Sequence, residues 1–492
     1  MSLTNALSVA LSGLQTSTAA AQVISNNVAN AQTNGYTNET IDLTEIVNSS
    51  GFGGVEISGY SNASDSVLSA TLNSATSNAS YLSTQNSYMT QVQSILDSTG
   101  NPPALSNDLS NFQSAWTEYA ASPSDVTLEK SVISTGQALA NEISNISTQT
   151  AALQTYAQTN LATSVKTLNT DLQQVQSLNS QISQALANNQ PVGELEDQRA
   201  QAINNVAQYT NVTVLQRSDG QVALYTSSGT ALIDGQAIPF AVSDNGNSVV
   251  NAAGNDVSSQ LSGGTLQAQT DFLSPTATTA NGVGVITKLQ SQLENFANLF
   301  VAQTPNNTGG SFADAYNTAA TGTGEQSQDF FTATIDSSTG LPDLSTFAVN
   351  ANLVNGTAAV KVASATAVSN TFAATNLAIQ PTVTGTSPNY TDTYATGTSF
   401  TAAGLSAQNQ TYSGIANAIL SGFQQAANTI QTQNATASTQ QAYYQSSLSS
   451  ETGVNTDSEL VNLTNWENSY AASAHVISTI QSMMQTLEGM VG

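Results

Sequence analysis

The sequence contains no cysteine in its 492 residues, which excludes disulfides, thiolate metal ligands and cysteine nucleophiles. Histidine occurs once, at His475, within a helical pattern near the end of the chain. A hydrolytic triad needs a base held between a nucleophile and a carboxylate, and a packing or solvated role suits a lone histidine in a helix better. The sequence therefore predicts no metal, no cofactor and no enzyme activity.

Positive charge is also scarce. Six basic residues stand against 32 acidic ones, which gives a formal net charge of −26, and only 8 % of the residues are charged. Ordinary soluble proteins reach about 25 %. Nucleic-acid binding depends on clustered Lys and Arg, and here the basic residues lie far apart, so we expect no nucleic-acid partner. They are Lys130, Lys166, Arg199, Arg217, Lys288 and Lys361.

Long apolar runs are missing as well. Ser, Thr, Asn and Gln interrupt every stretch that could span a bilayer, so we expect no membrane insertion. The first residues lack the basic start and continuous apolar run of a cleavable signal peptide. The sequence thus predicts a protein that stays in the cytoplasm or is exported by a route that reads no such signal.

Apolar residues near both ends recur at alternating spacings of four and three, the period of a coiled-coil seam. Such helices are marginal alone in water and gain stability by burying their stripes. We expect them to pack on each other, on the core or on other subunits. The N-terminal stripe is Leu3, Leu7, Ala10, Leu14, Ser17, Ala21, Ile24, Val28 and Ala31, and the C-terminal stripe is Trp466, Tyr470, Ser473, Ile477, Ile480, Met484, Leu487 and Val491.

Helical patterns between the two ends enclose a β-rich middle. The periodicity predicts helices over 63–98, 105–121, 195–209 and 409–450, and either one long rod or a hairpin of two helices over 126–188. Alternation around Asp219-Gly220 predicts a β-hairpin, and more strands follow to about residue 250. This order predicts an α+β multidomain fold with terminal coiled-coil helices, an elongated helical bundle and inserted β-rich domains.

The predicted domains nest inside one another. A terminal coiled-coil assembly domain joins 1–35 to 455–492, and a helical inner domain joins 36–210 to 409–454. A β-rich domain occupies 211–302, with a helix near 286–302. Residues 303–408 form an outer insert that is dominated by Thr, Ala, Gly, Asn and Ser and offers little to fix a core.

A group of charged residues at 194–199 combines Glu194, Glu196 and Asp197 with Arg199. Paired carboxylates can act as general acid and base, but acids next to a basic residue on a helix are typical of a solvated face with local ion pairs. We therefore expect this group to face solvent.

The stretch "SNNVANAQTNGYT" at 25–37 runs several amides along a helix that Asn34-Gly35 then stops. It resembles the N-terminal signature of the bacterial flagellar axial proteins, the rod, hook and hook-associated family. Segments 81–96, 195–225 and 452–487 are similar to hook-associated members in order and spacing. The resemblance covers 1–225 and 409–492, and it departs from the usual pattern at "NLTNWENSY" and in the Thr-rich insert.

The resemblance implies a structural role at the junction between hook and filament. In this family the paired terminal helices form the inner tube of an assembly, a helical domain surrounds them, and inserted β domains point outward. It further implies export through the flagellar type III apparatus without a cleaved signal, helped by a cytoplasmic chaperone, to an extracellular place in the flagellum. The implied partners are further copies in a ring, the hook protein, and the next hook-associated protein or filament subunits.

The amides of the opening motif suit a tube of identical subunits. Asn26, Asn27, Asn30 and Gln32 can bond to neighbouring chains without the repulsion between like charges that a repeated charged residue creates. The alternative is that they are exposed helix residues with no such role. The predicted assembly interface comprises Leu3, Leu7, Leu14, Ile24, Asn26, Asn27, Val28, Asn30, Gly35, Tyr36, Trp466, Tyr470, Ile477, Ile480, Met484, Leu487 and Val491.

Two other functions stay open. A hook or distal rod protein shares the opening motif, although the long helical block at 126–188 and "LEDQRAQA" argue against it. A secreted adhesin or hydrolase would carry its site in 211–408, where "NYTDTY" gathers aromatic residues and an acid.

Overall fold

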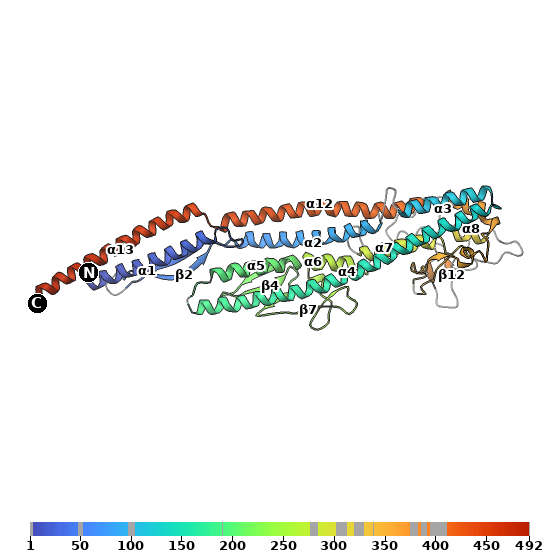
Figure 1. The fold of residues 1–492 in the computed structure, drawn as a ribbon. Helices are drawn as coiled ribbons and strands as arrows, with labels where there is room; N and C mark the ends of the chain where they lie inside the picture. The colour runs from blue at the N-terminus through green and yellow to red at the C-terminus, as the bar shows by residue number, and fades with distance from the viewer. Residues whose placement is uncertain are drawn as a thin grey trace.

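The computed structural model describes residues 3–47, 53–96, 104–188, 190–275, 284–301, 312–318, 329–337, 339–373, 382–384, 391–393 and 411–491. The molecule is a long rod of helices with small sheets along one side, and both termini lie at the same end (Figure 1). The predicted α+β class, with long terminal helices and an elongated helical bundle, is confirmed.

The end of the rod that holds the termini is a narrow arm. Helix α1 (Leu3–Asn30) lies beside helix α13 (Thr456–Val491), as Figure 1 shows. Strands β1 (Glu39–Glu45) and β2 (Val55–Asn62) form an antiparallel ribbon along α1, with a bulge between Asp42 and Leu43. The sequence-based prediction contains no strand in this region. We call α1, β1, β2 and α13 the terminal arm, and the remainder the body.

Long helices make up most of the body. Helix α2 (Ser66–Leu96) packs against α12 (Tyr412–Thr452), and below them lie α4 (Val126–Ala187), α5 (Gly193–Tyr209) and α6 (Gly264–Leu273), while α3 (Ala104–Ala121) packs on α4 at the far end. Helix α4 is a single helix of 62 residues, which decides between the rod and the hairpin of two helices. Asp125 caps it, because its carboxylate accepts the N–H of Thr127 at 2.7 Å.

The predicted hairpin is confirmed in the sheet that lies against α4 and α5. Strands β3 (Val212–Gln216), β4 (Val222–Thr226), β5 (Ala231–Asp234) and β6 (Gln236–Ala237) pair antiparallel in that order, and Gly220 turns the chain between β3 and β4 with a φ of +80°. A second ribbon pairs β7 (Phe240–Val242) with β8 (Val249–Asn251).

The end of the body far from the termini holds short elements. They are helices α8 (Phe312–Thr318), α9 (Ala351–Val354) and α10 (Ala365–Ala373), the 3₁₀ turn η2 (Val362–Ser364), and strands β9 (Phe331–Thr332), β10 (Ala348–Val349), β11 (Thr382–Thr384) and β12 (Thr391–Thr393). Helix α7 (Val285–Asn298) packs on α4, α6 and α12 and leads toward this end, whereas the 3₁₀ turn η1 (Ser258–Gln260) lies beside β8, where the Ser258 hydroxyl accepts the N–H of Val249 at 2.9 Å.

The expectation that 303–408 has little to fix a core is wrong for its described part. Phe312, Tyr316 and Phe330 are buried, and their rings lie 5.5 to 6.0 Å from the ring of Trp116 in α3. These aromatics are scattered through Thr- and Ala-rich sequence without a period, so no pattern marked them. Edge-to-face contacts of this kind make the far end a packed aromatic core.

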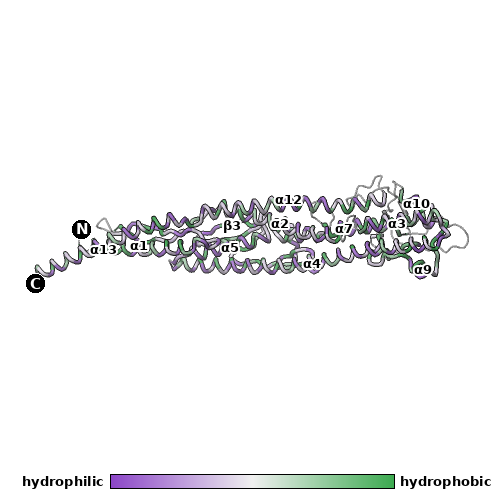
Figure 2. The backbone as a smooth tube through the Cα atoms, turned by 45° about the horizontal axis from the view of Figure 1, so that its top comes forward, coloured by the Kyte–Doolittle hydropathy of each residue, from purple (hydrophilic) through white to green (hydrophobic). Residues whose placement is uncertain are grey.

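Apolar residues are spread along the whole rod (Figure 2), and the main hydrophobic core runs continuously through the body from α2 to α12. Among the described residues, none of α1 or α13 belongs to that core. The terminal arm is therefore held to the body by other contacts.

Gly136 lies in the middle of α4, where a Cβ would come within 2.8 Å of the Phe330 ring and 3.1 Å of the Phe112 ring. Replacing a helical glycine by alanine usually stabilises by about 1 kcal/mol, whereas forcing extra volume into a packed core costs about 1–3 kcal/mol. We expect Gly136→Ala to lower the midpoint of thermal unfolding, measured by circular dichroism.

Gly422 in α12 is the matched control, since a Cβ there meets nothing within 4 Å. Gly422→Ala should raise the midpoint. A gain of the same size from both substitutions would contradict the close packing of the aromatic core on α4.

Candidate assembly site: the terminal arm and its joint with the body

The predicted stripes meet where α1 lies against α13. Ile24 and Ile480 are buried, at 5 % and 3 % exposure. Six further members of the predicted interface are half-buried along the same pair, namely Leu3, Leu7, Leu14, Trp466, Ile477 and Met484. The two ends of the chain thus cover much of each other's apolar surface.

Three members of the predicted stripes lie outside this contact. Val28, Tyr470 and Leu487 are exposed, and the side chain of Val491 falls outside the described residues. A strict seven-residue repeat drifts by about 20° per heptad on a straight helix. This drift leaves Leu487 only about 20° from Ile480, which is buried, so it does not account for the exposure of Leu487. The last turns of α13 instead extend past the start of α1 (Figure 1).

Leu487 belongs there to a second apolar stripe. Val476, Met483, Leu487 and Met490 follow one another at spacings of seven, four and three, so they share one face of α13. All four are exposed, and Met490 reaches 79 %. We call these four residues the outer stripe. The outer stripe was not predicted from the sequence, because Leu487 also fits the spacing of the buried stripe.

Asn27 lies at the joint where the terminal arm meets the body, and it is completely buried. Its amide nitrogen donates to the backbone oxygen of Glu39 at 2.8 Å and to a carboxylate oxygen of Glu459 at 3.2 Å. Its amide oxygen accepts from the Tyr36 hydroxyl at 2.9 Å and from the backbone N–H of Glu39 at 3.1 Å. One side chain therefore connects α1, β1, α13 and the loop between α1 and β1.

The prediction that the opening amides face neighbouring chains is wrong for Asn27, because all four of its hydrogen bonds lie within the chain. The amide of Asn30 donates to the backbone oxygen of Asn26 in its own helix. Asn26 and Gln32 are exposed. For these two residues the contact with a neighbouring chain stays a prediction. The motif serves first as an internal joint.

The loop between α1 and β1 closes against α5. The side chain of Gln201 donates to the backbone oxygen of Asn34 at 2.7 Å. Gly35 follows with a φ of +82°, and a Cβ there would lie 2.5 Å from the Gln201 amide nitrogen. The backbone conformation therefore favours glycine at position 35, and Tyr36 can then turn toward Asn27.

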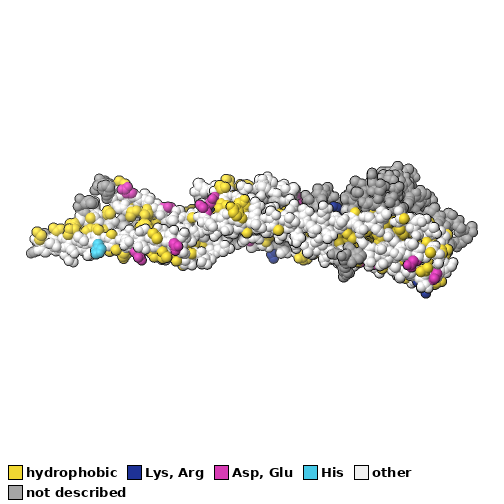
Figure 3. Space-filling view, turned by 90° about the horizontal axis from the view of Figure 1, so that it is seen from above, with side chains coloured by type: hydrophobic (Ala, Val, Ile, Leu, Met, Phe, Trp, Pro, Cys, Tyr) yellow, Lys and Arg dark blue, Asp and Glu magenta, His cyan; other side chains and the backbone are white. Residues whose placement is uncertain are grey.

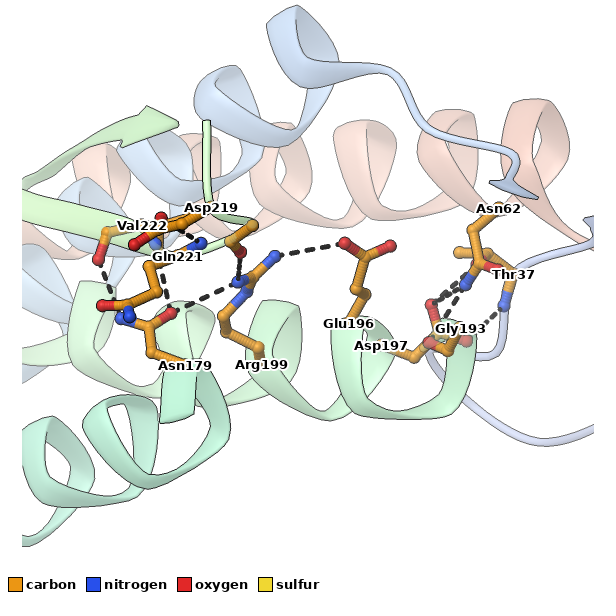
Figure 4. Close-up of polar contacts among 11 residues, drawn as sticks. Thr37, Asn62, Asn179, Gly193, Glu196, Asp197, Arg199, Asp219, Gln221 and Val222 are labelled. Atoms are coloured by element: carbon orange, nitrogen blue, oxygen red, sulfur yellow. Dashed lines mark hydrogen bonds and ion pairs between the residues drawn. The ribbon is translucent and has the colours of Figure 1, made fainter. Parts of the chain in front are cut away.

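Asp197 of α5 holds the start of the ribbon (Figure 4). Its carboxylate accepts the backbone N–H of Thr37 at 2.9 Å and the Thr37 hydroxyl at 2.6 Å. Asn62, at the end of β2, donates to the same hydroxyl at 3.0 Å, to Asp197 at 3.3 Å and to the backbone oxygen of Gly193 at 3.0 Å. The terminal arm and the body thus share a polar network.

Arg199, two residues further along α5 and so about half a turn away, points the other way (Figure 4). It donates to Asn179 of α4 at 3.2 Å and to the backbone oxygen of Gly220 at 2.6 Å, and it pairs with Glu196 at 3.4 Å. The expectation of a solvated face is wrong here, since Arg199 is only 5 % exposed. Its guanidinium satisfies the carbonyl of the β3–β4 turn, which no local pattern could show.

Acids gather at the joint. Burial raises the pKa of Glu39, and the nearby Asp197 raises it further. Burial also raises the pKa of Asp197, although its bonds to Thr37 and Asn62 oppose that shift. Burial together with Glu39, Asp197 and Glu459 raises the pKa of Tyr36 to about 12. Deprotonated Glu39 and Asp197 are therefore costly in the folded joint.

The described joint consists of amides, hydroxyls, carboxylates and backbone groups. Across the described ranges, no three His, Asp or Glu side chains are grouped so that they could hold a metal ion. His475 is exposed on α13. Within the same part of the chain, no helix is both long and apolar enough to cross a membrane.

Asn27→Asp should loosen the joint. The substitution keeps the shape but replaces the donor to Glu459 by a second carboxylate, and an unpaired buried charge costs about 3–5 kcal/mol. We expect chymotrypsin to cut after Tyr36 about tenfold faster or more. Asn26→Asp, on the exposed side of α1, is the matched control and should leave the rate unchanged. Equal cleavage rates for both variants would contradict the role of the Asn27 hydrogen bonds in holding the joint closed.

The joint should also grow more stable as the pH falls. Glu39 and Asp197 have folded pKa values above their unfolded ones, so the folded state binds more protons between the two values. The free energy of unfolding then decreases as the pH rises through that window, from about 4 upward. Urea unfolding read by Trp466 fluorescence in a Trp116→Phe background should give a higher midpoint at pH 5 than at pH 7.

Glu39→Gln is the control for this pH dependence, because it removes one titrating group and leaves the ribbon backbone in place. The difference between the two midpoints should shrink. A urea midpoint that is higher at pH 7 than at pH 5 in the parent chain would contradict the prediction that Glu39 and Asp197 control the pH dependence of stability.

Two family models match the chain. The one described as "Flagellar hook-associated protein FlgK helical domain" matches residues 89–331. The one described as "Flagellar basal body rod FlgEFG protein C-terminal" matches residues 445–490, which covers the end of α12 and most of α13. The first falls on the body and the second on the terminal arm.

Curated relatives carry the same description. Flagellar hook-associated protein 1 of Bacillus subtilis is 26 % identical over 364 residues, which is 66 % of this chain and 69 % of that protein. The protein of that name from Salmonella typhimurium is 25 % identical over 46 % of this chain and 42 % of its own length. A solved structure, the flagellar hook junction protein FlgK from Burkholderia pseudomallei, matches with a TM-score of 0.43 and 23 % identity over 54 % of this chain and 47 % of its own.

These matches agree with the opening motif and with the paired terminal helices. The helical-domain model and the curated relatives name hook-associated proteins, and the model that covers the C-terminal helix names flagellar rod proteins. The chain therefore carries a match to the FlgK helical domain along its body and is similar to flagellar hook-associated protein 1 of other bacteria.

Proposed function

We propose that this chain is the structural subunit that joins hook to filament, and that it works as one of several copies in a thin ring. The observation that carries the proposal is the outer stripe of α13. The terminal arm uses one stripe of α13 internally and leaves a second one, Val476, Met483, Leu487 and Met490, open to solvent.

An open apolar stripe on a slender arm has a physical consequence. Burying apolar surface stabilises by about 25 cal/mol per Å², and large exposed apolar patches mark interaction sites. The inner pairing leaves the terminal arm folded while the outer stripe remains available to terminal arms of other subunits. Hook protein on one side, and the next hook-associated protein or filament subunits on the other, are the proposed neighbours.

The joint sets the direction of the terminal arm. Its network of Asn27, Glu459, Thr37 and Asp197 fixes α1 and α13 relative to the body by directional bonds. A subunit that presents its outer stripe at one fixed angle can repeat the same contact around a closed ring.

Export belongs to the same proposal. We propose passage through the flagellar type III apparatus without a cleaved signal, helped by a cytoplasmic chaperone, and an extracellular position in the flagellum. We also propose that the chain has no catalytic activity. The hook and rod alternative is less favoured, because the helical-domain match and the named relatives point to hook-associated proteins. No described feature of 211–408 favours an adhesin or a hydrolase.

Leu487→Asp tests the outer stripe. Because Leu487 is 49 % exposed, the substitution should change the melting of the purified chain little, within about 0.5 kcal/mol. In an assembled interface the carboxylate would be buried without a partner, at a cost of several kcal/mol. We expect an unchanged melt by circular dichroism together with loss of the protein from purified flagella.

Leu487→Met keeps the apolar volume and should be incorporated normally. Ile477→Asp differs, because Ile477 is half-buried against α1, and it should also loosen the terminal arm of the free chain. Normal incorporation of Leu487→Asp would remove the outer stripe from the mechanism.

Deletion of the coding sequence tests the junction itself. We expect cells that build hooks but carry no attached filaments, with filament subunits released into the medium. Electron microscopy of the cells and gel analysis of the medium measure the two effects. Filaments of normal number and attachment in the deletion strain would refute the proposed function.

A further inference from the structure

Charge is distributed unevenly among the long helices. Residues 1–38, 66–96 and 393–450 contain no Asp, Glu, Lys, Arg or His at all. These segments include α1, α2 and all of α12 up to Ser450. The acidic and basic residues of the helices lie instead on elements such as α4, α5 and α13.

Helix α12 displays this charge-free sequence to solvent. Gln425, Asn428, Thr432, Thr439, Tyr443 and Ser446 follow one another at spacings of three, four and seven, so they share one face, and all six are exposed. We call them the α12 stripe. In the view from the α12 side the middle of the rod is drawn largely in white, the colour of uncharged polar side chains and backbone (Figure 3).

Two threonine hydroxyls of this face already have hydrogen-bond partners within the helix. Thr432 donates to the backbone oxygen of Asn428 and Thr439 to that of Ala435, each at 2.9 Å. A buried hydroxyl costs free energy only when it lacks a partner. Since these bonds lie within α12 itself, another surface can cover the face without leaving the hydroxyls unsatisfied.

Tyr443 provides an anchor in the α12 stripe. Its ring is 66 % exposed and stands edge-on to that of Tyr444, at 5.4 Å between centroids. Tyrosine is enriched at the centres of protein interfaces, where a large rigid ring can be buried and its hydroxyl bonded. An exposed tyrosine on a helix face otherwise made of amides and hydroxyls suits such a contact.

The charge of the whole chain identifies the occupant. At a net charge of −26, any two copies repel each other, and contact through an acidic face would set like charges together. A surface that binds a basic partner would be expected to carry acidic residues, whereas a surface that binds a second copy of this acidic chain is expected to carry no charge. We propose that the α12 stripe is the surface through which the body of one subunit packs laterally on a second copy of this chain.

This inference rests on the proposed function and adds a contact to it. The outer stripe would join terminal arms at the centre of the ring, and the α12 stripe would join bodies around it. The two surfaces lie on different helices and can be tested separately.

A photoreactive residue in place of Tyr443 tests the contact in assembled flagella. We expect ultraviolet light to give a covalent dimer of the chain, at about twice its mass of 50.6 kDa, identified by peptide mass spectrometry. The same residue in place of Tyr470, exposed on the terminal arm, shows that the chain is in the flagellum and that the chemistry works. Absence of the chain from flagella in both cases would count against the proposed function.

Crosslinks from position 470 with none from position 443, or products at 443 that contain only a different protein, would overturn this inference and leave the junction role standing. Charge gives a second test. Gln425→Glu/Asn428→Asp adds two charges to the stripe without changing its shape, and repulsion between copies should lower the amount of chain in flagella by about tenfold.

Gln173→Glu/Gln174→Glu is the matched control, since both glutamines are exposed on α4, a helix that already carries charge. It should be incorporated like the parent chain, and both double variants should melt like the parent. An equal loss for the α4 variant would show that added charge in general, and not the α12 stripe, limits assembly.

Discussion

The structure depends on a small polar joint between the terminal arm and the body, because the described helices of the terminal arm take no part in the main hydrophobic core of the body. Among the described residues, the main core contains nothing from α1 or α13, so their position relative to the body rests on hydrogen bonds. Asn27 uses its whole amide at this joint, and Glu459, 4 % exposed, accepts from both Asn27 and Asn38. Directional bonds fix an angle better than apolar contact does, because they weaken steeply when they bend.

Scarcity of charge shapes the rest of the molecule. Many buried positions are polar, and the helices accommodate them by local bonds: Thr16, Ser17 and Thr150 are buried, and each donates to a carbonyl four residues earlier at 2.7 to 2.8 Å. Such a side chain is satisfied in water and under a neighbouring helix alike. Hydroxyls that are bonded in this way can be covered by another surface without losing a hydrogen bond.

The sequence predicted whatever depends on local period. The period of Leu161, Val165, Leu168 and Leu172 predicted helix in α4, although it left one rod and a hairpin of two helices open, and Asp219-Gly220 predicted a β-hairpin. It did not reveal the joint, because Asn27 and Glu459 are 432 positions apart, and an amide in a motif reads the same whether it faces a neighbour or its own chain.

Other features escaped for equally physical reasons. The ribbon of β1 and β2 has no buried residue, and the sequence prediction overlooked its short alternation of Ile41 with Leu43 and of Val55 with Ile57. Leu487 keeps the heptad spacing of the buried Ile480, but the last turns of α13 extend past the start of α1, an offset that spacing within one helix does not show. Where helices are periodic and the spacing is regular, the pattern sufficed; where a residue's role depends on its contact with a distant segment, only the folded chain defined it.

Helix α4 gives the subunit a mechanical property. At 1.5 Å of rise per residue, its 62 residues extend for about 93 Å without a break. A strut of that length, clamped along its side by α5, α6 and the sheet, resists bending, since a kink would break several backbone bonds at once. Strain along the flagellar axis would then concentrate at Gly453, between α12 and α13, and at the joint beside it. The body would then keep its shape under load, and the subunit would bend mainly between the body and the terminal arm.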